Sequence, residues 1–330
     1  MKRYGHLYGQ VASFKNLLDA AGKAQRGKRF KESTAVFNLS LENELLELQS
    51  ELRGKTYRIG KYKRFFIYDP KKRLISALPY RDRVVQHALC NVIEPIFDNG
   101  LIYDTYACRE NKGSHKAVNR FAEYCRRNKY ALKCDIKSYF ASIDHEILSG
   151  MIERKIKDPD VLWLIKLIID STPSPGIPIG NLASQIFANL YLNDLDHYLK
   201  ETLKCRNYIR YMDDLVVFSE DKDTLSMVKD AIKQNLKRLK LELHPDKSQI
   251  YITTKGIKFL GYKIYPTHRL VITQNIRRFR HRVKKYFGLL ESGQITMTKI
   301  IRSVQSWLGY AIHADTFKLR RNILSEFNLG

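Results

Sequence analysis

The spacing of apolar and polar residues divides the first third of the chain into a few expected elements. Residues 43–49 have the spacing of an amphipathic helix. Between residues 56 and 78, β-branched and aromatic residues alternate with basic ones, which predicts a basic β-hairpin. Asp82 is expected to cap the next helix, which would bury one face made of Val84, Val85, Ala88 and Leu89.

The middle of the chain combines a buried strand with a loop rich in proline and glycine. Residues 130–135 read as a strand that ends in an acid, and Ser142 or Asp144 could cap the helix that follows. Residues 171–181 hold three prolines and two glycines, so they are expected to form a loop. A long helical pattern through Ile186, Leu190 and Leu195 comes directly after this loop.

Two acids lie between two strand-like runs. Residues 208–211 and 215–218 are strand-like runs rich in β-branched and aromatic residues, and Met212-Asp213-Asp214 separates them. This pattern predicts a tight hairpin with the two carboxylates at its tip. A helix around residues 224–241 and short strands within 249–253 and 257–262 complete the expected core.

The charge balance indicates a polyanionic partner. Among 330 residues, 58 are Lys or Arg and 34 are Asp or Glu, a net charge of +24, and 44% are hydrophobic, enough for a sizeable core. Residues 257–330 hold 14 basic and 3 acidic residues, hence a charge of +11. Within them an apolar stripe is expected to pack while basic faces meet phosphate; the stripe is Ile276, Phe279, Val283 and Phe287.

Nothing in the sequence favours a membrane-spanning segment or an export route. No run of 18 apolar residues occurs, and the N-terminus lacks the apolar core of a signal peptide. The five cysteines form no CxxC pair, which suits reduced thiols. We therefore expect a cytoplasmic protein with no membrane partner.

Three aspartates have the arrangement that a two-metal site requires. Asp135 ends a buried strand, while Asp213 and Asp214 occupy a hairpin tip. Carboxylates on adjacent strands can hold two Mg²⁺ ions, with Mn²⁺ able to substitute, and such a site serves phosphoryl transfer. The alternative is that the Asp pair is only turn chemistry, but its flanks are buried strand residues rather than Gly or Asn.

At these residues the sequence resembles the reverse transcriptases. Tyr211-Met212-Asp213-Asp214 resembles their YMDD box, and residues 135–140, Asp-Ile-Lys-Ser-Tyr-Phe, resemble their first catalytic motif. Further similar segments follow in the family's order: Arg73, 82–86, 178–180, 244–247 and 259–262. The resemblance implies an α+β right-hand polymerase fold with a palm of antiparallel sheet and helices. Its expected parts are a basic N-terminal arm (1–30), fingers (31–110), a palm with the carboxylates (111–265) and a basic helical thumb (266–330).

The resemblance also implies roles for individual residues. Asp135, Asp213 and Asp214 would hold the metals, with the carbonyl oxygen of Ile136 a possible further ligand. Phe140 would be a steric gate against the ribonucleotide 2′-hydroxyl, so dNTPs are the expected substrates, although a core aromatic is the plainer interpretation. Arg73 would bind the triphosphate, with Lys72 as the competing candidate for this role. Lys247 would donate a proton to pyrophosphate. Gly180, Gln185 and Tyr211 would contribute to substrate binding.

One departure from the family pattern refines the class. Ile179 stands where many members have Gln, and Gly180-Asn181 is followed by Ser184-Gln185, which resembles the reverse transcriptases of diversity-generating retroelements. That class implies error-prone copying of a template-repeat RNA at adenines, a DNA or RNA primer, and a small basic helical accessory protein. A retron- or defence-type bacterial reverse transcriptase, or a catalytically silent RNA-binding protein, remains the alternative. The role of the basic residues at 1–34 stays open between RNA, a partner and solvent.

Overall fold

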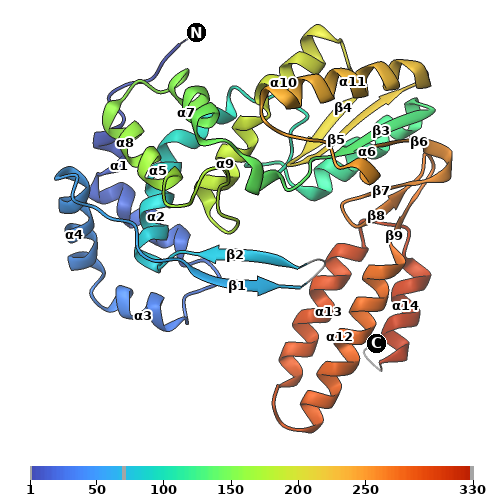
Figure 1. The fold of residues 1–330 in the computed structure, drawn as a ribbon. Helices are drawn as coiled ribbons and strands as arrows, with labels where there is room; N and C mark the ends of the chain where they lie inside the picture. The colour runs from blue at the N-terminus through green and yellow to red at the C-terminus, as the bar shows by residue number, and fades with distance from the viewer. Residues whose placement is uncertain (1, 69–71, 328–330) are drawn as a thin grey trace. The chain divides into compact units, whose positions relative to one another are not determined.

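The computed structural model describes residues 2–68 and 72–327, and its ribbon is shown in Figure 1. The chain divides into two compact units, each built from separate sequence segments. The first unit comprises residues 1–108, 135–204 and 230–244, and the second comprises 109–134, 205–229 and 245–330.

The first unit is mainly helical and carries one two-stranded sheet. Its N-terminal segment contains α1 (Tyr8–Val11), α2 (Phe14–Ala24), α3 (Glu32–Leu39), α4 (Leu41–Arg53), β1 (Lys63–Ile67), β2 (Arg73–Ala77) and α5 (Tyr80–Asp98). Its central segment contains the 3₁₀ turn η1 (Tyr139–Ser142), α7 (His145–Glu153), α8 (Pro159–Ile169), α9 (Leu182–Tyr191), α10 (Asn193–His197) and the π-helical turn η2 (Tyr198–Thr202). The antiparallel pairing of β1 with β2 confirms the basic hairpin.

The segment expected as a basic N-terminal arm contains the packed helices α1 and α2. Helix α2 packs on α5, and its Leu17 and Ala20 are fully buried. Asp158 caps α8 and also accepts hydrogen bonds from the backbone N–H groups of Leu7 and Tyr8, which attaches the N-terminal segment to that helix. The glycines and basic residues of this segment concealed a short apolar stripe that is sufficient to bury one helix face.

Asp82 was expected to cap a helix, and the structure shows otherwise. Helix α5 begins at Tyr80, after Pro79. The Asp82 carboxylate is buried and accepts hydrogen bonds from the Tyr57 hydroxyl and, at 3.3 Å, from the Gly60 backbone N–H. Burial, together with the nearby Asp82 charge, raises the pKa of Tyr57. Asp82 thus fixes the segment that leads into β1, a role that depends on residues 22 to 25 positions away.

Of the two candidate caps, Ser142 and Asp144, the structure selects Asp144 at α7. The helix that follows the proline-rich loop is shorter than its sequence pattern predicted. Asp144 accepts hydrogen bonds of 3.0 Å from the N–H groups of Glu146 and Ile147, so it is the cap and Ser142 is not. The helical pattern through Leu195 is interrupted at Leu192, between α9 and α10.

The second unit contains two antiparallel sheets and three C-terminal helices. Its elements are α6 (Ser114–Arg127), β3 (Tyr130–Asp135, whose last residue falls in the first unit), β4 (Tyr208–Tyr211), β5 (Asp214–Ser219), η3 (Pro245–Lys247), β6 (Gln249–Ile252), η4 (Thr253–Lys255), β7 (Ile257–Phe259), β8 (Tyr262–Ile264), β9 (Arg269–Val271), α12 (Thr273–Glu291), α13 (Met297–Ala311) and α14 (Phe317–Glu326). Helix α11 (Lys222–Arg238) crosses the division between the units. The strand order is β4-β5-β3-β6 in one sheet and β7-β8-β9 in the other.

Aromatic packing joins these elements. Phe121 of α6 lies edge-on to Phe218 of β5 at 4.9 Å and stacks on Phe259 of β7 at 4.6 Å between ring centroids. The expected stripe of α12 is confirmed at Phe279 and Val283, which are buried, and Phe279 stacks on Trp307 of α13 at 4.3 Å. The architecture is therefore the expected α+β class. Among the described residues, no helix is long and apolar enough to cross a membrane.

Candidate active site

The two acids lie at a two-residue turn between β4 and β5. Tyr211 pairs with Asp214 across the hairpin, so Met212 and Asp213 form the turn itself. Met212 has a φ of 55°, in the left-handed region that costs a residue with a side chain about 1 kcal/mol. Such strain persists only where the surroundings over-determine the backbone, and it is found preferentially at functional sites.

Arg210 supports this turn, and the sequence analysis did not single it out. Its side chain is fully buried, and its guanidinium donates a 3.2 Å hydrogen bond to the carbonyl oxygen of Met212. Arginine is almost never fully buried without partners. An arginine inside an apolar strand run, two residues before the turn, was the signal available in the sequence.

Lys133 is the second residue that the pattern did not reveal. Its Nζ lies 3.2 Å from Oδ1 of Asp214 and 3.3 Å from the carbonyl oxygen of Lys258. Because β5 and β3 are neighbours in the sheet, this ion pair holds the Asp214 carboxylate beside the final residues of β3. Asp135 is the last residue of that strand.

The backbone around Asp135 continues the pairing beyond the end of the strand. The N–H of His244 donates a 2.7 Å hydrogen bond to the carbonyl oxygen of Asp135. The N–H of Lys137 donates a 2.9 Å hydrogen bond to the carbonyl oxygen of Glu242. Ile136 forms an isolated β-bridge with Leu243, and its side chain is buried. The two backbone hydrogen bonds of this bridge involve Asp135 and Lys137, so the carbonyl oxygen of Ile136 accepts neither of them.

Phe140 and the proline-rich loop lie together in the first unit. A 3₁₀ turn follows Ser138, whose φ is 49°, and within it the half-buried Phe140 lies edge-on to Tyr139. The carbonyl oxygen of Phe140 accepts a 2.8 Å hydrogen bond from the N–H of Ile177. This bond fixes the start of the loop against the segment that follows Asp135.

The same loop is attached to the basic hairpin. The N–H of Ser76 in β2 donates a 3.0 Å hydrogen bond to the carbonyl oxygen of Ile179. Gly180 has a φ of 119°, and an added Cβ would lie 3.0 Å from Ile75 and 3.2 Å from the Ser76 oxygen. Only glycine meets both demands. The first unit therefore links β2, Ile179 and Phe140 through backbone contacts.

The other expected site residues are placed as follows. Arg73 is exposed at the first position of β2, and the Lys72 ammonium lies 4.4 Å from the centre of the Phe66 ring. Gln185 is half-buried in α9, Tyr211 ends β4, and Lys247 ends η3 in the second unit.

The chemistry of the three aspartates fits a divalent metal, although within residues 2–68 and 72–327 no group of three His, Cys, Asp or Glu side chains forms a metal-binding cluster. Carboxylate oxygens are the hard donors that Mg²⁺ prefers. One of these carboxylates, that of Asp214, already binds a cation in the form of the Lys133 ammonium.

A basic groove runs along the C-terminal helices of the second unit. Its volume is about 550 Å³, and of the described residues that line it three are cationic, none is acidic and the other five all carry hydroxyls. Its lining consists of Arg282, Tyr286, Thr296, Thr298, Lys299, Arg302, Ser303 and Ser306. Cations and hydroxyl donors without competing carboxylates are the groups that contact a nucleic-acid backbone.

Comparison with known proteins decides the family. The model of the reverse transcriptase (RNA-dependent DNA polymerase) family matches residues 63–264, more than half of the chain and every proposed site residue. The chain belongs to this family. Its enzyme class is accordingly RNA-directed DNA polymerase, and reverse transcriptases of this family act on RNA templates and primers.

Relatives of this reverse transcriptase are distant and of several kinds. Protein YkfC of Escherichia coli K12 is 26% identical over 67% of this chain and 71% of its own length. The group II intron-encoded protein LtrA of Lactococcus lactis is 22% identical over 68% of this chain but only half of its own length. The retron Ec73 reverse transcriptase of E. coli is 27% identical over 61% of this chain and 68% of its own.

A solved structure supports the fold. The structure of apo telomerase from Candida tropicalis superimposes with a TM-score of 0.51 and 13% identity, covering 63% of this chain and 48% of the telomerase chain. At this identity the likeness concerns the fold alone, which is the expected right-hand polymerase fold.

Proposed function

We propose that this reverse transcriptase makes cDNA by two-metal nucleotidyl transfer, with Asp135, Asp213 and Asp214 holding two Mg²⁺ ions. The observation that carries the proposal is the Lys133–Asp214 ion pair, which brings the acidic turn to the end of the strand on which Asp135 lies. When bound, the metals would activate the primer 3′-hydroxyl and neutralise the triphosphate. The carbonyl oxygen of Ile136 would be a further ligand.

The chain's own residues then position the substrates. Arg73 grips the triphosphate, because its guanidinium fork matches phosphate oxygens, and Lys72 contributes a weaker point charge. Phe140 faces the sugar and excludes the 2′-hydroxyl, which selects dNTPs. Lys247 donates a proton to the leaving pyrophosphate. Tyr211, Gly180 and Gln185 complete the nucleotide and template surface, and the basic groove of α12 and α13 binds the template–primer backbone.

Within this function we propose the diversity-generating class, on the strength of Ile179. An apolar residue at this position forms no side-chain hydrogen bond to the nascent pair, so discrimination rests on shape alone and is weak. The backbone bond from Ser76 and the glycine that follows hold Ile179 in place. The template would be a template-repeat RNA, copied with errors at adenine, and a small basic helical protein would assist its binding.

A retron-type enzyme is the second candidate, favoured by the 27% identity to the retron Ec73 reverse transcriptase. The two candidates differ in fidelity and in the RNA they use. Accurate copying, with priming on a structured noncoding RNA, would favour the retron type.

The experiment is Mg²⁺-dependent primer extension with dNTPs on an RNA template that contains adenines, with the accessory protein present and absent. Asp213→Asn is expected to reduce extension by about 10³-fold, because a metal contributes several kcal/mol to the transition state. The control is Asp223→Asn, an exposed acid in the first turn of α11 that should leave extension unchanged. Equal activity of both variants would refute the proposed chemistry.

Sequencing the products of the same reactions tests the class. Errors opposite template adenine are expected for the wild type and for Ile179→Leu, and fewer errors for Ile179→Gln. Equal error rates in all three proteins would remove Ile179 as the determinant of fidelity.

A further inference from the structure

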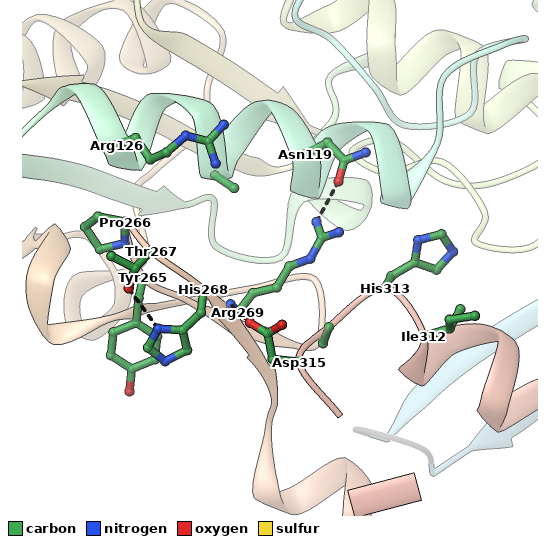
Figure 2. A pocket seen from close by; sticks show the side chains of 12 residues that line it. Asn119, Arg126, Tyr265, Pro266, Thr267, His268, Arg269, Ile312, His313 and Asp315 are labelled. Carbon is green, nitrogen blue, oxygen red and sulfur yellow. Dashed lines mark hydrogen bonds between the residues drawn. The ribbon is translucent and has the colours of Figure 1, made fainter. Parts of the chain in front are cut away.

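A second pocket lies within the second unit, among residues that the proposed polymerase site does not use. Figure 2 shows it between α6, the turn from β8 to β9, and the loop from α13 to α14. Its volume is about 390 Å³, near the lower end of the range for small-ligand sites, which suits a ligand the size of one nucleotide. The lining comprises Asn119, Ala122, Arg126, residues 265–269 and residues 312–315.

The pocket is predominantly cationic. Arg126 and Arg269 line it from opposite elements, and the Arg269 guanidinium donates a 2.6 Å hydrogen bond to the side-chain oxygen of Asn119 (Figure 2). Asp315 is the one carboxylate in the lining, and it lies 3.4 Å from the backbone nitrogen of Arg269. Asn119 thus orients the Arg269 guanidinium. The pocket has two guanidinium groups and one carboxylate, so its net charge is positive. Such an arrangement attracts phosphate.

Stacked rings flank these charges. Tyr265 and His268 stack with centroids 4.5 Å apart, and the Thr267 hydroxyl lies 2.9 Å from Nδ1 of His268, which fixes the imidazole (Figure 2). His313 stacks on His115 at 3.7 Å. Burial, His313 and Arg269 all lower the pKa of His115, as expected for a ring in positive surroundings. Flat rings beside arginines are the surfaces on which unpaired bases stack.

We propose that this pocket binds one unpaired nucleotide of RNA outside the region being copied. Arg126 and Arg269 contact its phosphates, and its base stacks on His268 or His313. An unpaired nucleotide fits better than a duplex, since the bases of a duplex are stacked on one another and cannot enter a pocket of this size. The site would hold the template RNA at a second point.

Photo-crosslinking gives the direct test. Full-length protein is irradiated with a 12-nucleotide single-stranded RNA that contains 4-thiouridine, and the crosslinked peptides are mapped by mass spectrometry. Crosslinks within residues 265–269 or 312–315 are expected. Crosslinks confined to the groove of α12 and α13, or to the first unit, would overturn the proposal even if every variant below proved unstable.

A matched pair of variants gives the energetic test, by fluorescence anisotropy with the same RNA. Arg126→Ala with His268→Ala should weaken binding about tenfold, as expected for losing one stacked base and a phosphate contact. Arg127→Ala with His281→Ala is the control, because Arg127 adjoins Arg126 on α6 but pairs with Glu123, and both control residues are exposed outside the pocket. Equal losses in the two double variants would overturn the site.

Competitors identify the ligand. Added before irradiation, neither ATP at millimolar concentration nor a 12-base-pair RNA–DNA duplex should reduce crosslinking of the single strand to the pocket. Loss of these crosslinks with ATP would replace RNA with a free nucleotide as the ligand, and their loss with the duplex would overturn the preference for unpaired RNA. Extension of a short preformed primer–template should be unchanged in the Arg126 and His268 variants, so failure of this proposal is separable from failure of the polymerase.

Discussion

The two hairpins that carry proposed site residues differ in their exposure to solvent. In the β4–β5 hairpin, three of the four β4 residues are buried, and the turn places its acids next to a buried arginine. In the β1–β2 hairpin, four of the five β1 residues are exposed, and so is Arg73, the one basic residue of β2. The strands of the first are buried up to a half-exposed turn, whereas the second is anchored at its base by the Ser76–Ile179 hydrogen bond.

This difference separates two kinds of contribution to catalysis. A carboxylate that must hold a metal needs a backbone that does not move, because small displacements at a reacting centre cost large factors in rate. A cation that captures a triphosphate from solution acts through long-range attraction and gains from a long, mobile side chain. We therefore expect substitutions to act mainly on the rate of chemistry in β4–β5 and on substrate affinity in β1–β2.

Outside the three aspartates, the largest expected effect is at Arg210. Arg210→Met should lower the free energy of unfolding by about 1.5–3 kcal/mol, because the Met212 carbonyl oxygen loses a charged donor. Extension at saturating dNTP should fall at least tenfold as the turn relaxes. Chemical denaturation and single-turnover kinetics measure the two quantities.

Arg210→Lys is the comparison for that experiment, since it keeps the charge and loses the planar fork. An intermediate loss of turnover is expected. If Arg210→Met proves destabilised yet fully active at low temperature, the rigid turn is not required for chemistry and the contrast between the hairpins fails.

The next effect concerns Arg73 and Lys72. Arg73→Ala should raise KM for dNTPs about tenfold with a small change in kcat, as expected for one charge-assisted contact to phosphate. Lys72→Ala should raise KM by about threefold or less, because its ammonium lies over the Phe66 ring and acts as a point charge. Steady-state kinetics over a range of dNTP concentrations decide this, and a larger effect at Lys72 would transfer the role to it.

The sequence predicted elements well wherever a single periodicity governs a segment. The basic hairpin, the strand ending at Asp135, the acidic turn and the apolar stripe of α12 all follow from local alternation or helical spacing, and the structure contains each of them. The loop before α9 follows from proline and glycine, which exclude regular structure locally.

Contacts between residues far apart in the chain could not be predicted from local sequence patterns. Lys133 and Asp214 are 81 positions apart, and nothing in either neighbourhood indicates the ion pair. The local sequence predicted that Asp82 caps a helix, but its carboxylate instead accepts tertiary hydrogen bonds from Tyr57 and Gly60. The N-terminal helices were missed because their stability comes from packing on α5, which appears only once α5 is folded.

The smallest effect is expected at Lys133, which connects the acidic turn to its neighbouring strand. Its ammonium occupies one oxygen of the Asp214 carboxylate, so it should compete with a metal for that ligand. Lys133→Met should therefore tighten Mn²⁺ binding about two- to fivefold, the range for a partly exposed ion pair. Titration followed by electron paramagnetic resonance measures this binding without any catalytic turnover.

Lys129→Met is the matched control, because Lys129 is exposed one residue before β3 and its ammonium lies 5.3 Å from the Tyr130 ring centre. It removes the same charge from the same region without touching Asp214. Tighter Mn²⁺ binding in the Lys133 variant alone would show that this lysine is a counter-ion of the site, displaced when the metal enters. Equal affinities in the two variants would mean that Asp214 does not bind the metal through the oxygen that faces Lys133. The carboxylates of the hairpin would then hold the metal in a different geometry from the one proposed.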